Sequence, residues 1–333
     1  MRHLVERAIS LILILFAMAV ITFFLARVVP ADPARLAAGI EARPEQIEAM
    51  RKDLGLDQPL YVQFQSYIAG LLKGDLGRSL RTRRPVLEDL KLYFPATLEL
   101  ALVSTFVIIL ISIPLGVIAA VNVGTWIDYL IRVFVVAAMG IPPFALGLVL
   151  QLLFGRWLGW LPLEGRLDQL LSPPPQVTGM FTIDSLLQGN WVAFRSSIEH
   201  LILPVTALAL GRFAVACLFT RGSMLDVLSR DYIRVARGKG LTEQRIIYRH
   251  ALRNSVLPVI TVLGVQIGYL LGGTILVETV FTFPGLGSYA VSSAVNSDFY
   301  SAIGATLVIS AMFAIANTVV DLLYRWADPR ITI

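Results

Sequence analysis

The sequence predicts an all-α integral membrane protein with six transmembrane helices and both termini in the cytoplasm. Of its 333 residues, 56% are hydrophobic and only 15% are charged, whereas about a quarter of a soluble domain is charged. The mean hydropathy is +0.73. Six apolar runs approach the ~20 residues that a helix needs to cross the hydrocarbon of a bilayer. One loop between two of these runs concentrates Lys and Arg.

The six apolar runs cover residues 8–26, 100–121, 133–155, 201–220, 257–277 and 302–320. Five of them carry no charge, and the fourth carries Arg212. The first run follows two arginines, as in a signal peptide, but it exceeds the ~7–15 residues of a signal peptide's apolar region. Because no convincing small-x-small cleavage site follows, we predict an uncleaved anchor. The single cysteine, Cys217, lies within the fourth run and excludes a disulfide framework.

The distribution of Lys and Arg predicts the orientation of the spans. Residues 221–256 hold eight Lys or Arg and three acids, whereas residues 278–301 hold no Lys or Arg. Basic short loops stay in the cytoplasm, so we expect the loop 221–256 and both termini on that side. The net charge of +5 therefore indicates orientation and contact with the lipid bilayer, and gives no reason to expect a nucleic-acid partner.

This orientation divides the chain into three parts. Residues 1–27 are predicted to form the cytoplasmic N-terminus and the first transmembrane helix. Residues 28–95 form an extracytoplasmic helical segment, and residues 96–333 form a core of five transmembrane helices that includes the loop 221–256. The outer segment carries many basic residues, but it is longer than the ~60 residues over which the charge rule operates.

The outer segment is expected to be folded into short helices. The first begins at Pro44, has Arg51 and Lys52 in its last turn, and stops at Gly55. The second carries the apolar stripe Leu60, Phe64, Tyr67, Ile68 and Leu71. A turn follows at residues 74–77, and a third short helix is expected from Pro85 to Phe94. This segment is either a helical cap on the outer leaflet or a docking rim for an external partner.

Two further outer loops are expected. Residues 156–199 contain the stiff stretch Ser-Pro-Pro-Pro at 172–175. Residues 278–301 contain a tight turn whose Pro and Gly content indicates a defined shape. We assign this turn either to a simple connector or to contact with an external binding protein. The candidate contact residues are Phe283, Pro284, Gly285 and Leu286.

The basic loop is predicted to be two helices joined by a glycine hinge. Leu225, Leu228, Tyr232 and Ala236 share one helical face, so the fourth span is expected to continue into the cytoplasm. Glycines on either side of Lys239 make further helix costly. Thr242 is then a candidate N-cap for a second short helix that runs to Asn254, before Pro258 opens the fifth span.

The second helix of the basic loop has two distinct faces. Ile246, Ile247, His250 and Ala251 form the less polar face, and Arg245, Arg249 and Arg253 form the charged face. Such a loop could bind anionic lipid headgroups or dock onto a protein. It is not a phosphate-binding loop, because the glycine spacing and the following Ser or Thr are absent. Attraction to lipid headgroups requires only charge, whereas a hinged, capped helix has a defined shape that lipid binding does not need. We therefore favour docking onto a protein.

Several motifs of this loop and of the remaining chain occur together in a known family. The loop reads DYIRVARGKGL at 231–241 and RHALRN at 249–254. The other motifs are LGLDQPLY at 54–61, GDLG at 74–77, PATLEL at 95–100, GWLP at 159–162, HLILP at 200–204, ETVF at 278–281, PGLG at 284–287 and DPR at 328–330. This pattern resembles the peptide/nickel group of ABC-importer permeases from end to end. Of the general Glu-Ala-Ala loop consensus of such permeases, only Ala236, Gly240 and Leu252 are present.

The resemblance implies a type I ABC-importer permease in the bacterial cytoplasmic membrane. It implies a heterodimer with a second homologous permease, two ATPase subunits inside and a substrate-binding protein outside. ATP and Mg would be held by the ATPase subunits, and no cofactor or metal by this chain. The loop 221–256 would transmit ATPase closure to the spans. The candidate coupling residues are Ala236, Arg237, Lys239, Gly240, Leu241, Thr242, Glu243, Arg245, Arg249 and His250.

The candidate translocation path centres on Arg212, a charge near the middle of the fourth span. A charge at that depth costs ~3 kcal/mol or more and usually faces protein or water. It either interacts with a peptide carboxylate in the path, makes a structural pair, for instance with Asp321, or lies in a shifted span that lets its charged end reach the membrane surface. The fifth span carries the small-residue stripe Gly264, Gly268 and Gly272, which allows close helix packing within the chain or against a partner. Gln266 and Asn317 complete the candidate path.

Two other classes of function compete with an importer permease. A secondary transporter or channel would favour intramembrane carboxylates, and an intramembrane enzyme would need paired acids, a His-Glu-x-x-His motif or a Ser/His set. The spans contain none of these. We therefore expect a non-catalytic permease for di- or oligopeptides or similar solutes. Within the group, nickel chelates, glutathione and oligosaccharides stay open as alternatives.

Overall fold

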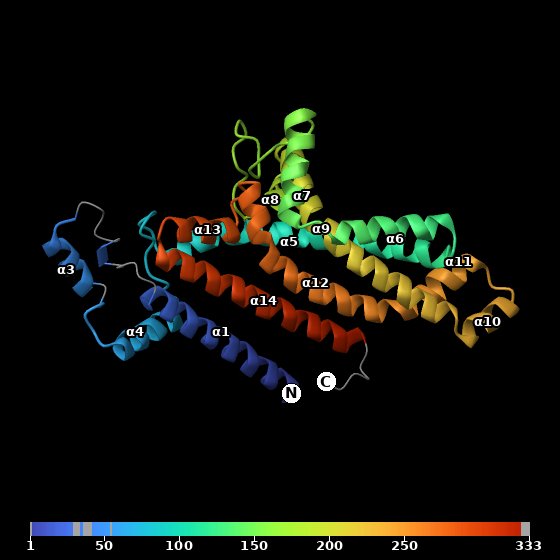
Figure 1. Ribbon diagram of the computed structural model, residues 1–333, viewed down its shortest axis with the longest axis horizontal. Helices are drawn as coiled ribbons and strands as arrows, with labels where there is room; N and C mark the ends of the chain where they lie inside the picture. Colours follow the sequence, from blue (N-terminus) through green and yellow to red (C-terminus); the bar gives the residue numbers. More distant parts are fainter. Residues whose placement is uncertain (1, 29–33, 36–41, 54, 328–333) are drawn as a thin grey trace. The chain divides into compact units, whose positions relative to one another are not determined.

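The computed structural model describes residues 2–28, 34–35, 42–53 and 55–327, and in this part of the chain helices are joined by loops, without a β-strand (Figure 1). The chain forms two compact units. One comprises residues 1–97 and 284–314, and the other residues 98–283 and 315–333. The predicted all-α fold is therefore confirmed for the described residues.

Three helices are long and apolar enough to cross a membrane: α5 (Val86–Val121), α9 (Trp191–Leu228) and the Phe299–Val320 part of α14 (Phe299–Ala327). Two bent helix pairs also qualify if each pair counts as one span, which makes up to five within the described residues. Helix α1 (Arg2–Val28) contains a shorter apolar stretch, Ile12–Phe24.

The second span is longer than expected. Val86–Val121 is one helix of 36 residues, so the prediction of a separate short helix ending near Phe94 is wrong. Val86, Leu90, Ala96 and Leu100 are all buried along it, and this packing carries the helix through Pro95, where local preference alone suggests an end. At ~1.5 Å per residue the helix is ~54 Å long, which exceeds the ~30 Å of bilayer hydrocarbon.

The third predicted span is bent rather than straight. Helix α6 (Trp126–Met139) is followed after a short break by α7 (Pro143–Leu150) and the π-helical turn η1 (Gln151–Trp157). The two arms meet at 101°, so the expectation of one continuous span over 133–155 is wrong. The cause is local. Two consecutive prolines lack N–H donors, and Pro142 itself is extended, with ψ 135°.

Helix α9 is the central element of the second unit. Its 38 residues contact α6, α7, the short helix α8 (Phe181–Leu187) and α12 (Leu252–Val280). Gly116 of α5 lies against α9 so closely that an added Cβ atom would stand 2.5 Å from the Cβ of Thr220 and 2.8 Å from the carbonyl oxygen of Cys217. The two helices can approach this closely only because position 116 has no side chain.

A buried ion pair joins α6 to α9. Asp128 is 1% exposed and receives two hydrogen bonds from Arg221, at 2.7 and 2.9 Å. Arg132, one turn along α6, adds a longer contact of 3.4 Å to the same carboxylate. The two-pronged geometry and the neighbouring donors compensate the cost of burying this charge.

The first unit contains the remaining short helices, α3 (Pro44–Asp53), α4 (Leu60–Leu72) and α13 (Leu286–Val295). The predicted helices at 44–55 and 60–71 are confirmed, as is the turn at 74–77, where the N–H of Gly77 donates to Asp75. Within this unit, Phe23 of α1 packs edge-on against Phe64 of α4 at 5.2 Å. The buried Asp89 accepts hydrogen bonds from the hydroxyls of Thr82 and Tyr289.

Gly116→Val tests the close contact of α5 with α9. We expect a lower midpoint of thermal unfolding in detergent, because the new side chain overlaps Thr220 and a backbone carbonyl, and overpacking typically costs ~1–3 kcal/mol. Gly211→Ala on α9 is the matched control, since its added Cβ stands at an ordinary 3.6 Å from its nearest neighbour. Equal midpoints for the two variants would contradict the close contact.

Asp128→Asn tests the ion pair. The substitution leaves the guanidinium of Arg221, whose side chain is 19% exposed, without its counter-charge, and breaking a buried pair costs ~3–5 kcal/mol. Arg132→Gln removes the 45% exposed partner and should have little effect, because exposed pairs contribute ~0–1 kcal/mol. The yield of folded protein after heating ranks the variants, and a larger loss for Arg132→Gln would refute this assignment.

Candidate functional site

The basic loop begins where α9 ends. Helix α9 stops at Leu228, and a separate helix, α10 (Asp231–Gly238), follows. The prediction that the fourth span continues unbroken to Ala236 is therefore wrong. The hydroxyl of Ser229 donates to the carbonyl of Asp226 at 2.7 Å, and Arg230 is extended, with ψ 150°. Serine competes for local backbone groups in this way and favours helix ends.

Helix α10 is held by a small apolar cluster. Ile233 is fully buried and Ala236 is 8% exposed, and both pack with Ile246 of the next segment. Leu228 and Leu241 complete this cluster. The opposite side of α10 is exposed, with side chains of mixed character: Tyr232, Arg234, Val235 and Arg237. Helix α10 thus has one exposed face, while its other face is packed against the rest of the loop.

A glycine makes the turn between the two helices. Gly240 has φ +77°, a backbone conformation that residues with a side chain rarely adopt. Its N–H donates to the carbonyl of Arg237 at 2.9 Å. The Arg237 guanidinium also reaches across the turn and donates to the carboxylate of Glu243 at 2.7 and 3.2 Å. Both side chains of this pair are about half exposed, so the pair adds little stability.

The second helix starts where the sequence predicts it. Thr242 occupies the N-cap position, but its hydroxyl makes no capping hydrogen bond; its carbonyl accepts the N–H of Ile246 instead. The segment then runs through α11 (Glu243–Arg245) and the π-helical turn η2 (Ile246–Ala251) into α12. A bend of 54° separates residues 243–256 from the span that starts at Pro258.

The two predicted faces of this second helix are confirmed. Arg245, Arg249 and Arg253 are exposed, whereas Ile246 and Ala251 are fully buried. Ala251 belongs to a second apolar cluster, whose other buried members come from the adjacent ends of α5 and α9: Val117, Ala120, Met224 and Val227. The loop is therefore packed against two long helices and is covalently continuous with a third, α12.

The predicted path residues lie on three helices. Arg212 of α9 is half-buried and donates to the side-chain oxygen of Gln266 at 3.2 Å and to the carbonyl of Tyr269 at 3.1 Å, both on α12. Gly268 is buried, and Asn317 on α14 is half-buried. Gly272 lies within α12, but its surroundings fall outside the described residues, as does the side chain of Asp321.

The predicted contact turn at 283–286 is mostly covered. Phe283 and Leu286 are fully buried, Gly285 is buried too, and Pro284 is exposed. The Phe283 ring lies 5.6 Å from the guanidinium carbon of Arg166. Among these four residues, Pro284 is the one whose side chain is free to meet an external partner.

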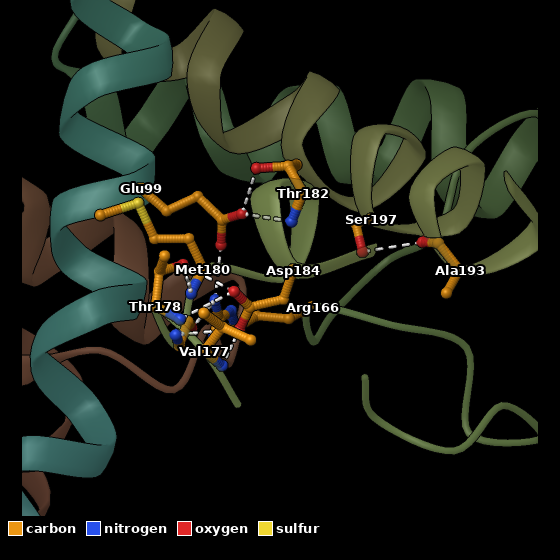
Figure 2. Close-up of polar contacts among 10 residues, drawn as sticks. Glu99, Arg166, Val177, Thr178, Met180, Thr182, Asp184, Ala193 and Ser197 are labelled. Atoms are coloured by element: carbon orange, nitrogen blue, oxygen red, sulfur yellow. Dashed lines mark hydrogen bonds and ion pairs between the residues drawn. The ribbon is translucent and has the colours of Figure 1, made fainter. Parts of the chain in front are cut away.

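The structure also contains a polar anchor that sequence reasoning missed. Arg166, in the connection between η1 and α8, donates to the buried carboxylate of Glu99 on α5 (Figure 2). Thr182 of α8 donates to the same carboxylate through its N–H and its hydroxyl, at 2.8 and 2.6 Å. The Arg166 guanidinium also stacks over the ring of Phe181 at 3.9 Å. The only indication of this anchor in the sequence is the single acid Glu99, directly before the apolar run 100–121.

A second carboxylate shapes the same connection. Asp184 accepts hydrogen bonds from the N–H groups of Val177, Thr178 and Gly179 and from the Thr178 hydroxyl (Figure 2). Burial opposes the charge on Asp184, but these hydrogen bonds to the ionised form outweigh burial and lower the pKa of Asp184. The three residues 177–179 that lead into α8 are therefore held in a defined shape.

Comparison with known proteins matches this chain along its whole length. Residues 112–333 match the family described as binding-protein-dependent transport system inner membrane component. Residues 1–101 match the N-terminal part of the membrane component of the same systems. Together the two matches cover all of the chain except residues 102–111 and include the basic loop and the polar anchors.

Similar individual proteins are named as peptide permeases. The probable D,D-dipeptide transport system permease DdpB of Escherichia coli K12 is 46% identical, over 98% of this chain and 96% of that protein. The dipeptide permease DppB of Alkalihalophilus pseudofirmus is 39% identical, over 99% and 98%. The glutathione permease GsiC of E. coli K12 is 39% identical, over 99% of each chain.

The family consists of membrane-embedded permease components, which are not enzymes. This agrees with the helices long enough to span a membrane and with the exposed helix on the basic loop. The chain thus belongs to the family of binding-protein-dependent transport system inner membrane components and acts as the permease of an ABC importer.

Proposed function

We propose that this chain is one of two homologous permease subunits of a bacterial inner-membrane importer of di- or oligopeptides. Two ATPase subunits that hold ATP and Mg would bind inside, and a substrate-binding protein would deliver the solute outside. The named relatives support a peptide as solute, because D,D-dipeptides, dipeptides and glutathione are all small peptides. Nickel chelates and oligosaccharides are the alternatives within the group.

The proposed topology has six spans with both termini in the cytoplasm. It counts α1, α5, the bent pair α6–α7, α9, α12 and α14 as the six. Residues 1–27 and 28–95 would then form the N-terminal anchor and an outer helical segment, and residues 96–333 the core with the coupling loop 221–256. The absence of Lys and Arg from residues 278–301 and their excess in the loop 221–256 support this orientation.

The basic loop is proposed to couple ATPase closure to the spans. The single observation that carries this proposal is the arrangement of α10, which has one face exposed and the other held by Ile233 on Ile246. A helix that moves with its neighbours can transmit a push, whereas a flexible loop would absorb it. The second apolar cluster, around Ala251, ties the same segment to the ends of α5 and α9.

The proposed coupling residues then take different roles. Exposed side chains would meet the ATPase: Arg237, Lys239, Thr242, Glu243, Arg245 and Arg249. Ala236 and Leu241 are at least partly buried and would act by holding α10 in place. Gly240 would set the turn, and the half-buried His250 borders the contact. Arg234 and Val235, which stand where the general consensus has Glu-Ala, are also exposed on α10.

A transporter that works without ATP is the competing proposal. It would need coupling groups of its own, and proton coupling in particular uses carboxylates within the membrane. The apolar runs of this sequence contain no Asp or Glu. Purified permease in liposomes separates the two, since uptake without ATPase subunits and ATP would contradict the importer.

Gly240→Val tests the turn. Valine is β-branched and strained at φ +77°, so we expect α10 to move away from its packing contact with Ile246. We expect uptake of a dipeptide by the reconstituted complex to fall tenfold or more, while insertion and ATPase binding persist. Gly238→Ala is the control, because an added Cβ meets no atom within 4 Å there and the backbone is helical. Uptake by Gly240→Val at the control rate would exclude a role for this turn.

A single cysteine on α10 tests docking directly. The native Cys217 is buried and can be replaced by Ser. In that background, Arg234→Cys should cross-link to an ATPase subunit through a short thiol-to-amine reagent, because the Arg234 side chain is 75% exposed. Val123→Cys is the control: Val123 is also exposed and lies in the connection between α5 and α6, which the proposed six-span topology places on the same side. Equal cross-linking at both positions would argue against α10 as the docking element.

A further inference from the structure

Helices α9 and α12 lie side by side (Figure 1) and share an exposed face. They run antiparallel, because the basic loop joins the end of one to the start of the other. On α9, this face carries partly or fully exposed residues at helical spacing: Arg212, Val215, Phe219, Gly222 and Asp226. On α12, it carries Pro258, Thr261, Val265 and Tyr269. Arg212 lies near the middle of both helices, where it meets Gln266 and Tyr269.

One end of this face opens into a polar cavity of about 670 Å³ next to the basic loop. Its lining includes Asp226 and Arg230 from the end of α9, Tyr232 from α10, and Asn254 and Ser255 from α12. A cavity of this size, with charged and amide groups in its wall, takes up water. Water therefore has access to the face that carries Arg212, at the end next to the loop.

Among the residues that the structure describes, no carboxylate forms an ion pair with Arg212. Its two hydrogen bonds go to a neutral amide oxygen and to a backbone carbonyl. Its Nε atom is buried without a hydrogen-bond partner in the part of the chain that the structure describes. In contrast, Arg166 and Arg221 each donate to a buried carboxylate. Arg212 thus has a fixed position and a net positive charge.

A charged side chain at the middle of a span does not face lipid, because that position costs ~3 kcal/mol or more. The face of α9 and α12 around Arg212 must therefore meet water, solute or protein. Arginine has five N–H donors arranged in a planar fork, and two contacts from one side leave donors for a carboxylate. Gln266 and the Tyr269 carbonyl hold the guanidinium in one orientation and leave its charge for a ligand.

We propose that Arg212, positioned by Gln266, binds the carboxylate of the transported solute as it passes along the α9–α12 face towards the polar cavity. The proposal rests on the importer function and narrows its substrate class to small solutes with a carboxylate. Binding by one arginine, without a second cation, allows the solute to leave again. The polar residues of the cavity then receive the solute at the loop end.

The first experiment asks whether position 212 faces water. In the Cys217→Ser background, Arg212→Cys in the full complex is treated with a membrane-impermeant anionic thiosulfonate. We expect modification, slowed when the complex turns over with a dipeptide and its binding protein. Phe106→Cys on α5 is the control, because Phe106 is 64% exposed within an uncharged apolar run and should face lipid. Absence of modification at 212 would overturn the proposal.

The second experiment measures dipeptide uptake by Arg212→Gln, Arg212→Lys and Gln266→Leu in reconstituted complexes. We expect uptake by Arg212→Gln to fall tenfold or more, while the binding protein still stimulates ATP hydrolysis. Arg212→Lys keeps the charge but loses the fork, so its KM should rise several-fold with insertion intact. Gln266→Leu frees the guanidinium and should also raise KM, with little change in the maximal rate.

The outcomes distinguish a carboxylate-binding role of Arg212 from a role in assembly. A wild-type KM for Arg212→Lys together with wild-type uptake by Arg212→Gln would overturn the carboxylate site. Loss of Arg212→Gln from the membrane, with Arg212→Lys inserted and its KM unchanged, would assign Arg212 to assembly and overturn the site as well. Failure of the importer function itself looks different, since the unmodified complex would then show no ATP-dependent uptake.

Discussion

The cost of leaving charges and backbone polar groups unpaired in hydrocarbon governs this structure. It requires helices, because only a helix satisfies its own backbone within a single span. It also dictates how charged side chains are paired in the second unit, residues 98–283 and 315–333. Asp128 meets Arg221 between α6 and α9, and Glu99 meets Arg166 between α5 and the connection before α8. These pairs join elements far apart in the chain at points where an unpaired charge would cost several kcal/mol.

The arginines of the basic loop and Arg212 depart from this pairing of buried charges, each in a different way. The arginines of the loop are exposed at its surface and are supported from below by two apolar clusters, around Ile233 and Ala251. They suit contact with a partner outside the membrane. Arg212 lies half-buried near the middle of the α9–α12 pair, where its described hydrogen-bond partners are neutral acceptors, and it suits a ligand that binds transiently. The two features lie along the same pair of helices, α9 and α12.

Local sequence rules succeeded where the deciding forces act between neighbours in the chain. The helix from Pro44, the glycine turn at Gly240 and the two faces of the helix after Thr242 follow from capping, positive φ and periodicity. The rules failed where distant contacts decide. Burial along α5 carries the helix through Pro95, and packing covers Phe283, which its turn-like surroundings had marked as a contact residue.

The sequence by itself determined that the chain is helical and embedded in a membrane, where its basic loop lies, and which family it resembles, because composition, apolar run length and motif order are local properties. Tertiary structure alone decided the pairing of Glu99 with Arg166 and of Asp128 with Arg221. Tertiary structure also decided that Arg212 of α9 lies beside Gln266 of α12. A charged residue can be recognised in any sequence, but only the fold determines which groups surround it.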